Sequence, residues 1–365
     1  MRPVQATVGR MGSAMKKLLI GLAILALLLV GAWYGAETWL SRFVTRTLAD
    51  QPGIAAEIAP LRQPGRLGLH MQGIELADSS AGGLNADSLD AYIRLLSPTT
   101  LNVDLPRTAT LNPAQGAATL VQLQDGQAEV TLSPTRELAI SHVRLTGRDL
   151  MLNEAAAFDQ LDVAANLTHM GGAAPTGSAA AYRLDLAGAG LAFGALPERL
   201  DIGGAVQVWL DGIPDLPVMQ GTTPPPQPTG FQTQNVTFTL GPISARLAGR
   251  IEADADGLAS GQAAIYTASA PDLVEAAVTA GLMPPKIGEA VQAVLIRLAG
   301  EPPEAAEATE PMDAVEAADE QALAEEVVTL PPAGPGELRL PLFFGNGIVR
   351  LGPVPLGPAP RISGF

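Results

Sequence analysis

The chain has no cysteine among its 365 residues, which excludes disulfides, thiolate catalysis and cysteine-bound metal. Aromatic residues make up 4% and charged residues 16%, so any core must be packed mainly from aliphatic side chains. Basic residues number 22 against 37 acidic ones, and the formal net charge is -15. Because nucleic-acid affinity comes mainly from basic side chains that neutralise phosphates, this balance argues against a nucleic-acid partner. Anionic headgroups would also repel such a surface, so we expect lipid contact outside a membrane anchor to involve acyl chains or neutral surface.

One long hydrophobic run stands near the start of the chain. The segment from Leu18 to Ala36 has no charged side chain, and as a helix it would span about 28 Å, close to the thickness of a bilayer's hydrocarbon core. Arg10, Lys16 and Lys17 precede it, which predicts a cytoplasmic N-terminus. We therefore expect a single-pass membrane protein, with a retained signal anchor and an exported C-terminal domain.

A cleaved signal peptide is the alternative interpretation of this run, because Val30 and Ala32 are small residues at positions that a peptidase could use. The length of the run and a helical pattern that continues from Glu37 to Leu48 favour retention. Met15 is a possible true start. The predicted organisation is a pre-start or cytoplasmic tail over 1–14, an anchor helix with its extension over 15–48, and an exported β-rich domain over 52–365.

After residue 52 the apolar residues alternate with polar ones, which is typical of half-buried β-strands. Gln72 and Gly73 interrupt the first alternation, as a β-bulge would. The predicted fold is mainly β with minor α, namely a large antiparallel curved sheet or a sandwich. The apolar positions of the clearest alternating segments are Leu67, Leu69, Met71, Ile74 and Leu76; Leu161, Val163, Ala165 and Leu167; Val206, Val208 and Leu210; Val236, Phe238 and Leu240; and Leu338, Leu340 and Leu342.

Three dipeptides predict tight hairpin turns, because Asp-Gly and Asn-Gly readily supply positive φ angles. Asp125-Gly126 separates two alternating segments over 120–123 and 128–132. Asp256-Gly257 lies between segments over 243–251 and 261–266, and Asn346-Gly347 between segments over 338–344 and 348–351. A parallel fold would need helices between its strands, and most of the intervals are too short or too rich in glycine and proline to supply them.

One C-terminal helix pair is predicted, over 271–280 and 286–299. The first begins with Pro271 and stops before Gly281, and the second places its aliphatic residues on one stripe. Two segments are predicted to be flexible: the proline-rich stretch 218–229, and the stretch 301–327, which has many acidic residues and no basic one.

The sequence offers little sign of catalysis. Its only histidines are His70, His142 and His169, and none has a second histidine or a carboxylate at ligand spacing. The glycines from Gly188 to Gly194 have the wrong spacing for a dinucleotide loop, and no Walker motif or nucleophile elbow occurs. We therefore expect no enzyme, no cofactor and no metal.

Several C-terminal segments carry a family resemblance. They are Gly241 to Gln262, the helix end Ala280 to Pro284, and the stretch Phe344 to Arg361. In these segments the chain resembles a bacterial family catalogued as domain of unknown function number 2125. The resemblance implies a membrane-anchored, β-rich protein and no established activity. With the predicted anchor, it places the chain in the bacterial inner membrane as a single-pass protein, with its C-terminal domain in the periplasm.

Two functions are favoured by these features, ahead of an enzyme. The first is a non-enzymatic structural or assembly factor of the cell envelope, whose partners are other envelope proteins. The alternative is a lipid-binding or lipid-transport module that holds acyl chains on an apolar sheet face, similar in plan to the AsmA-like lipid carriers. A closed sandwich would favour the first, and accessible aliphatic residues the second. The candidate ligand face consists of Leu67, Leu69, Val206, Val208, Val236 and Phe238.

Overall fold

The computed structural model describes residues 35–46, 53–78, 82–113, 116–192, 195–196, 198–219, 222–300 and 330–362. Most of the predicted anchor and the acidic stretch 301–327 lie outside the described residues. Residues 35–46 are helical, which confirms the helical pattern predicted to follow the uncharged run. No helix within these ranges has the length and apolar character needed to cross a membrane.

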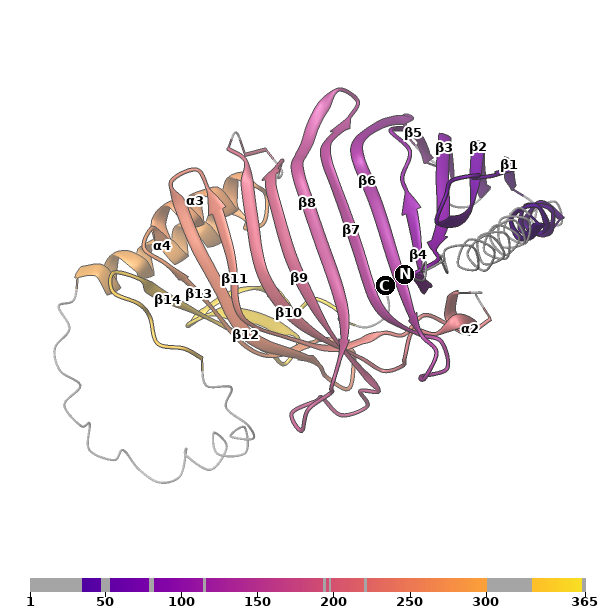
Figure 1. Cartoon of the computed structure of the whole chain (residues 1–365). Coiled ribbons are helices and arrows are strands. Elements are labelled where there is room, and N and C mark those ends of the chain that lie inside the picture. The colour runs from indigo at the N-terminus through magenta and orange to yellow at the C-terminus, as the bar shows by residue number, and fades with distance from the viewer. Residues whose placement is uncertain are drawn as a thin grey trace, which may run out of the picture. The chain divides into compact units, whose positions relative to one another are not determined.

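The described strands form one large antiparallel sheet, as the alternation predicted. Strands follow one another across the sheet in sequence order, except that β5 pairs with β3 and β6 beside the main path. The chain divides into two compact units, over residues 1–122 and 123–365, and the boundary falls inside strand β6 (Figure 1).

The first unit contains five strands and the beginning of a sixth among its described residues. They are β1 (Ile54–Pro60), β2 (Arg66–Asp78), β3 (Gly82–Arg94), β4 (Ser97–Asp104), β5 (Thr108–Pro113) and the start of β6 (Thr119–Ser133). The predicted bulge is confirmed: Gly73 has a φ of 55°, and the pairing of β1 with β2 shifts register there, from Ala55 opposite Glu75 to Glu57 opposite Gln72.

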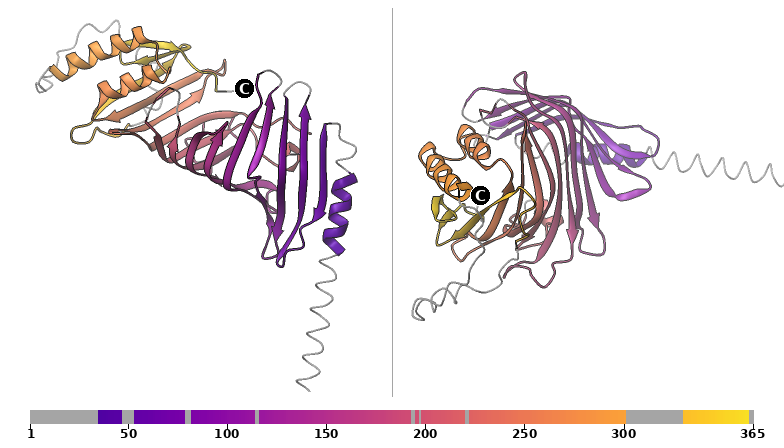
Figure 2. Two further views of the ribbon diagram at one scale, coloured as in Figure 1. Left: turned by 90° about the horizontal axis from the view of Figure 1, so that it is seen from above. Right: turned by 90° about the vertical axis from the view of Figure 1, so that its left-hand side faces the viewer.

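The second unit holds most of the sheet and the described helices that lie between its strands in the sequence (Figure 2). Its strands after β6 are β7 (Ala139–Leu152), β8 (Ala155–Thr168), β9 (Ala180–Leu191), β10 (Leu200–Leu210), β11 (Pro228–Leu240), β12 (Ile243–Ala253), β13 (Ala259–Thr267), β14 (Leu338–Gly345), β15 (Ile348–Leu351) and β16 (Val354–Pro358). A single turn of helix, α2 (Leu216–Met219), precedes the proline-rich residues 222–227.

Two of the three predicted hairpins are confirmed. Gly257, with a φ of 76°, lies between β12 and β13, and Asn346-Gly347, with φ of 52° and 72°, joins β14 to β15. The hairpin predicted at Asp125-Gly126 is wrong, because β6 runs through both residues. Asp125 takes a φ of 49° inside the strand, and the residues before it pair with β5 instead of folding back on the residues after it.

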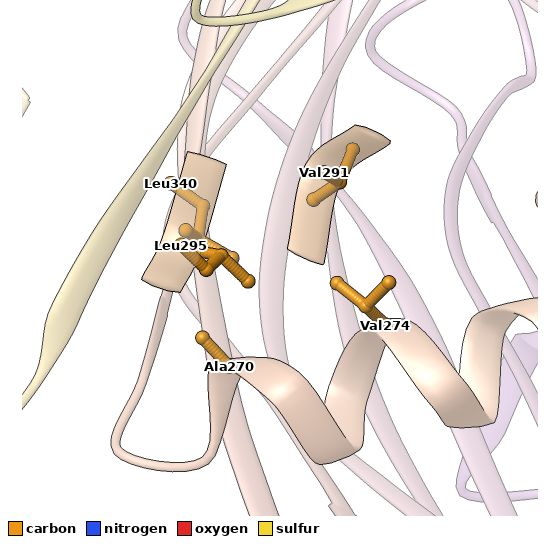
Figure 3. Packing of buried hydrophobic residues seen from close by; sticks show 5 residues of the cluster. All are labelled: Ala270, Val274, Val291, Leu295 and Leu340. Atoms are coloured by element: carbon orange, nitrogen blue, oxygen red, sulfur yellow. The ribbon is translucent and has the colours of Figure 1, made fainter. Parts of the chain in front are cut away.

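The predicted helix pair is confirmed as α3 (Ala270–Thr279) and α4 (Pro285–Gly300). Pro271 lies in the first turn of α3, where its missing amide proton costs nothing, and Gly281 takes a φ of 77° after the helix ends. The two helices pack on one face of the C-terminal strands. Their shared core is the cluster Ala270, Val274, Val291, Leu295 and Leu340 (Figure 3).

Candidate functional site

The apolar face of the second unit is the candidate site, and the strand register builds it row by row. Residues directly opposite each other in an antiparallel pair share one face of the sheet. One such row crosses eight consecutive strands, from β7 to β14. Its members are Leu145, Val163, Leu186, Gly204, Val236, Leu247, Ile265 and Leu340.

Two further rows flank this one on the same face, since every second residue of a strand points the same way. Only two of their members are polar, and both of these are threonines. One row consists of Val143, Ala165, Leu184, Val206, Thr233, Gly249, Ala263 and Leu342. The other consists of Gly147, Leu161, Gly188, Ile202, Phe238, Ala245, Thr267 and Leu338.

The three rows differ in exposure along the sheet. At the C-terminal end Leu340 is only 6% exposed, because α3 and α4 cover it. At the opposite end Leu145 is 39% exposed. From β7 to β10 every valine, leucine and isoleucine of the three rows is partly or fully exposed, and none is buried. The helix pair therefore covers the face at β13 to β15, and the face remains accessible at β7 to β10.

Two further features limit the extent of the accessible apolar surface. Ala359 and Ile362, after β16, form a cluster with Ala259 and cover Phe231 and Ile251. In the row beyond Val206, Tyr182 lies opposite Val208 and is 5% exposed. The Tyr182 hydroxyl donates a 2.5 Å hydrogen bond to the carbonyl of Ile140, and burial raises the pKa of Tyr182 to about 12. A neutral, hydrogen-bonded tyrosine thus ends the apolar face without placing a charge there.

The other face of the same strands is polar. One row across it contains His142, Asn166, Arg183, Gln207, Gln232, Arg250 and Gln262. Arg183 and Gln207 line an open hollow of about 720 Å³ on this face. Further along, the Trp209 ring is buried beneath Arg250, with 5.4 Å between guanidinium carbon and ring centre. The sheet is therefore polar on one side and apolar on the other.

An ion pair on the polar face links β7 to β8. The guanidinium of Arg144 donates to both carboxylate oxygens of Asp162, at 3.0 and 2.6 Å. These hydrogen bonds lower the pKa of the Asp162 carboxyl and raise that of Arg144. Both groups are substantially exposed, so solvent screens the pair and its effect on stability is small.

The six residues predicted to form the ligand face are distributed over both units. Leu67 and Leu69 lie on β2 of the first unit, opposite Ile93 and Ala91. Val206, Val208, Val236 and Phe238 lie on β10 and β11 of the second unit, on its apolar face. Leu69, Val208 and Val236 are buried, at 7%, 9% and 3% exposure, whereas Leu67, Val206 and Phe238 are partly exposed.

The register also assembles residues that the sequence did not single out as a site. Leu145 and Leu186 are the clearest, since both lie in the central row and both are accessible. Alternation assigns each residue to one face of its own strand. It does not say which strands are neighbours, so the sequence could not predict the continuous row from Leu145 to Leu340.

Each of the three histidines has a local partner within its own unit. In the first unit His70 Nδ1 pairs with Asp90 on the neighbouring strand, a carboxylate partner that sequence spacing did not indicate. In the second unit His142 Nδ1 lies 2.7 Å from Asn166 Oδ1, and His169 Nδ1 accepts a hydrogen bond from the Gly171 amide at 3.0 Å. Across the described ranges no group of three or more histidine or acidic residues is arranged to hold a metal ion.

Comparison with known protein families gives a match. Residues 33–311 match the model of a family described as "Uncharacterized protein conserved in bacteria (DUF2125)". The match includes the first two segments on which the resemblance was based and ends before Phe344 to Arg361. No curated protein and no solved structure matches the chain.

Proposed function

The chain belongs to the family of uncharacterized bacterial proteins DUF2125, and we propose that its second unit is a non-enzymatic lipid-binding module. In this proposal acyl chains lie along the accessible apolar face between β7 and β10. The protein acts at the cell envelope, anchored in the bacterial inner membrane with both units in the periplasm, where it holds or transfers lipid.

A single observation carries the proposal: the rows of aliphatic residues continue past the helix pair onto strands where they are accessible. Leu340 and Ile265 pack beneath α3 and α4, whereas Leu186 and Leu145 in the same row are accessible. Exposed aliphatic surface of this extent is unfavourable in water, at about 25 cal/mol for each Å². A ligand that covered the face would remove this cost.

The chemistry of the face favours acyl chains over a protein segment. No charged residue and no amide side chain occurs in its three rows, so it lacks the polar groups that fix the orientation of a bound peptide. Three strand spacings from β7 to β10 measure about 14 Å, close to the roughly 15 Å half-thickness of a bilayer's hydrocarbon core. The width of the accessible face therefore matches the length of an acyl chain.

The sequence supports the location. The uncharged run from Leu18 to Ala36 follows Lys16 and Lys17, an arrangement typical of an anchor whose downstream part is exported. Protease added to spheroplasts should digest both units of the full chain. Protection of both units until the membrane is lysed would contradict the proposed orientation.

Lipid binding can be tested on adjacent residues of β9. The full chain, purified from membranes in a mild detergent, should retain phospholipid in native mass spectra and after lipid extraction. The change Leu186→Asp places a charge on the apolar face and should lower the number of phospholipids bound, especially in combination with Leu145→Asp.

The matched control is Ala187→Asp, because Ala187 is exposed on the opposite face of the same strand. This variant should keep the lipid. Far-ultraviolet circular dichroism would verify that all variants remain folded. A wild-type chain that is free of lipid, or equal lipid retention in the Leu186→Asp and Ala187→Asp variants, would contradict the proposal.

An assembly role is the second candidate, and the edge strand β1 is the feature that favours it. Among the described strands, β1 pairs only with β2, so one side of its backbone can receive a strand from another protein. Crosslinking from a photoreactive residue at Ala55, which is exposed, would detect such a partner. A discrete envelope-protein adduct together with a lipid-free second unit would favour assembly over lipid binding.

A further inference from the structure

The helix over residues 35–46 has an inverted distribution of side chains. Its buried side carries Glu37 at 0% exposure and Ser41 at 6%, whereas Trp39 is 66% exposed and Phe43 is 54% exposed. A helix in water normally buries its aromatic residues and exposes its carboxylates. The outward side of this helix is thus suited to surroundings less polar than water.

Specific contacts fix this orientation. The Oε1 atom of Glu37 accepts a hydrogen bond from the Gly68 amide of β2 at 3.4 Å. Arg62 lies 3.9 Å from the other Glu37 oxygen and donates to Thr38 Oγ1 at 2.9 Å. Because these contacts hold the Glu37 side of the helix against the first unit, the opposite side must face outward.

The outward side combines aromatic and cationic groups. The rings of Trp39 and Phe43 stack, with centroids 5.5 Å apart and planes at 13°. They border a hollow of about 560 Å³, whose described lining includes three arginines and no acidic residue. The lining residues are Gly35, Thr38, Trp39, Arg42, Phe43, Arg46 and Arg62.

This composition matches the surface of an anionic bilayer. Tryptophan and other aromatic side chains favour the zone between headgroups and hydrocarbon. Arginine binds phosphate oxygens bidentately and extends its charge toward water from an apolar stem. The local charge is opposite to that of the whole chain, which carries -15, and the helix directly follows the uncharged run from Leu18 to Ala36 in the sequence.

We propose that this face of the helix lies on the membrane surface, with Trp39 and Phe43 among the headgroups and Arg42, Arg46 and Arg62 on the phosphates of anionic phospholipid. Electrostatic contact with lipid is thus confined to one small patch of an otherwise acidic protein. The inference uses only residues of the first unit, so it stands or falls separately from lipid binding by the second.

The first experiment measures membrane depth. Because the chain has no cysteine, a nitroxide can be placed at a single Phe43→Cys site in the full chain, reconstituted in nanodiscs of phosphatidylcholine with phosphatidylglycerol. The label should be accessible to oxygen and shielded from a water-soluble nickel chelate. A label at Ala187→Cys, on the polar face of the second unit, should show the reverse. Equal chelate access at both sites would overturn the proposal.

The second experiment tests the arginines. In native mass spectra of the detergent-purified full chain, phosphatidylglycerol should outcompete phosphatidylcholine. The double change Arg42→Gln and Arg46→Gln should reduce this preference by about 30-fold. The charge-matched control, Arg94→Gln with Arg107→Gln, alters two exposed arginines elsewhere in the first unit and should leave it unchanged. An equal loss in both double variants would show that only net charge matters and would overturn the assignment to this patch.

Discussion

The guanidinium carbon of Arg246 lies 3.8 Å from the centre of the Tyr266 ring. The same guanidinium donates to Glu337, with Nη2 to Oε2 at 2.8 Å, and the Tyr266 hydroxyl donates to the Pro331 carbonyl at 2.5 Å. Tyr266 is fully buried as a result. These contacts fasten the segment 330–337 across the polar face of β12 and β13, at the point where the chain enters β14.

The change Glu337→Gln should lower the stability of the second unit at neutral pH. The hydrogen bonds from Arg246 lower the pKa of Glu337 below its ordinary 4.5, so the contribution is fully present above that value and is lost as the pH falls through the lowered pKa. Urea unfolding at neutral and acidic pH would measure it. The variant and the wild type should differ at neutral pH and converge at low pH. The change Glu275→Gln, at an exposed position of α3, should have no such effect.

Tyr182 should ionise late. Burial raises its pKa from 10.0 to about 12, so the folded protein retains this proton after an unfolded chain would have lost it. The stabilising contribution is therefore complete below 10.0 and declines as the pH rises toward about 12. A phenolate absorbance titration should contain a late step that Tyr182→Phe removes. A titration unchanged by this substitution would refute the assignment.

Removal of side-chain volume beneath the helix pair should be costly. Leu295 on α4 is 4% exposed and packs in the cluster with Leu340, so Leu295→Ala should lower the free energy of unfolding by about 2–5 kcal/mol. Glu289→Ala, at an exposed position of the same helix, should change it by less than about 0.5 kcal/mol. Chemical denaturation of both variants measures the two changes in the free energy of unfolding. Similar changes would mean that α4 does not pack closely against the sheet.

Neighbouring glycines of β10 should respond differently to alanine. Gly204 has a φ of +128°, and a Cβ there would lie 2.3 Å from the Asn235 carbonyl oxygen, beside the register shift between β10 and β11. At Gly203 the nearest atom would be 3.5 Å away. Gly204→Ala should therefore cost at least about 1–3 kcal/mol, whereas Gly203→Ala should be tolerated. Thermal unfolding of the two variants provides the test, and equal midpoints would contradict it.

Local chemistry was sufficient to predict much of the fold. The turns at Gly257 and Asn346-Gly347 follow from backbone preferences of two residues, and α3 from a proline start and a glycine stop. The same reasoning failed at Asp125-Gly126, because a positive φ also fits a bulge within a continuous strand. The choice depends on pairing with β5, which is set by residues outside the dipeptide.

The candidate site was less predictable for a related reason. The alternation correctly grouped Val206 with Val208 on one face, yet Val208 is buried and Val206 is partly exposed. That difference arises from neighbouring strands and covering segments that only the folded register defines. The outward position of Trp39 and Phe43 was likewise not predictable, since nothing in the sequence shows that Glu37 occupies the inner side of the helix.

The strand order has a consequence for how the protein is made. From β6 to β13 each strand pairs with the one that precedes it in the chain, so these sheet contacts join segments that are synthesised close together in time. Low sequence separation of this kind speeds folding, and N-terminal parts fold first during synthesis. This part of the sheet can therefore form strand by strand as the polypeptide emerges, because each new strand pairs with the strand synthesised just before it.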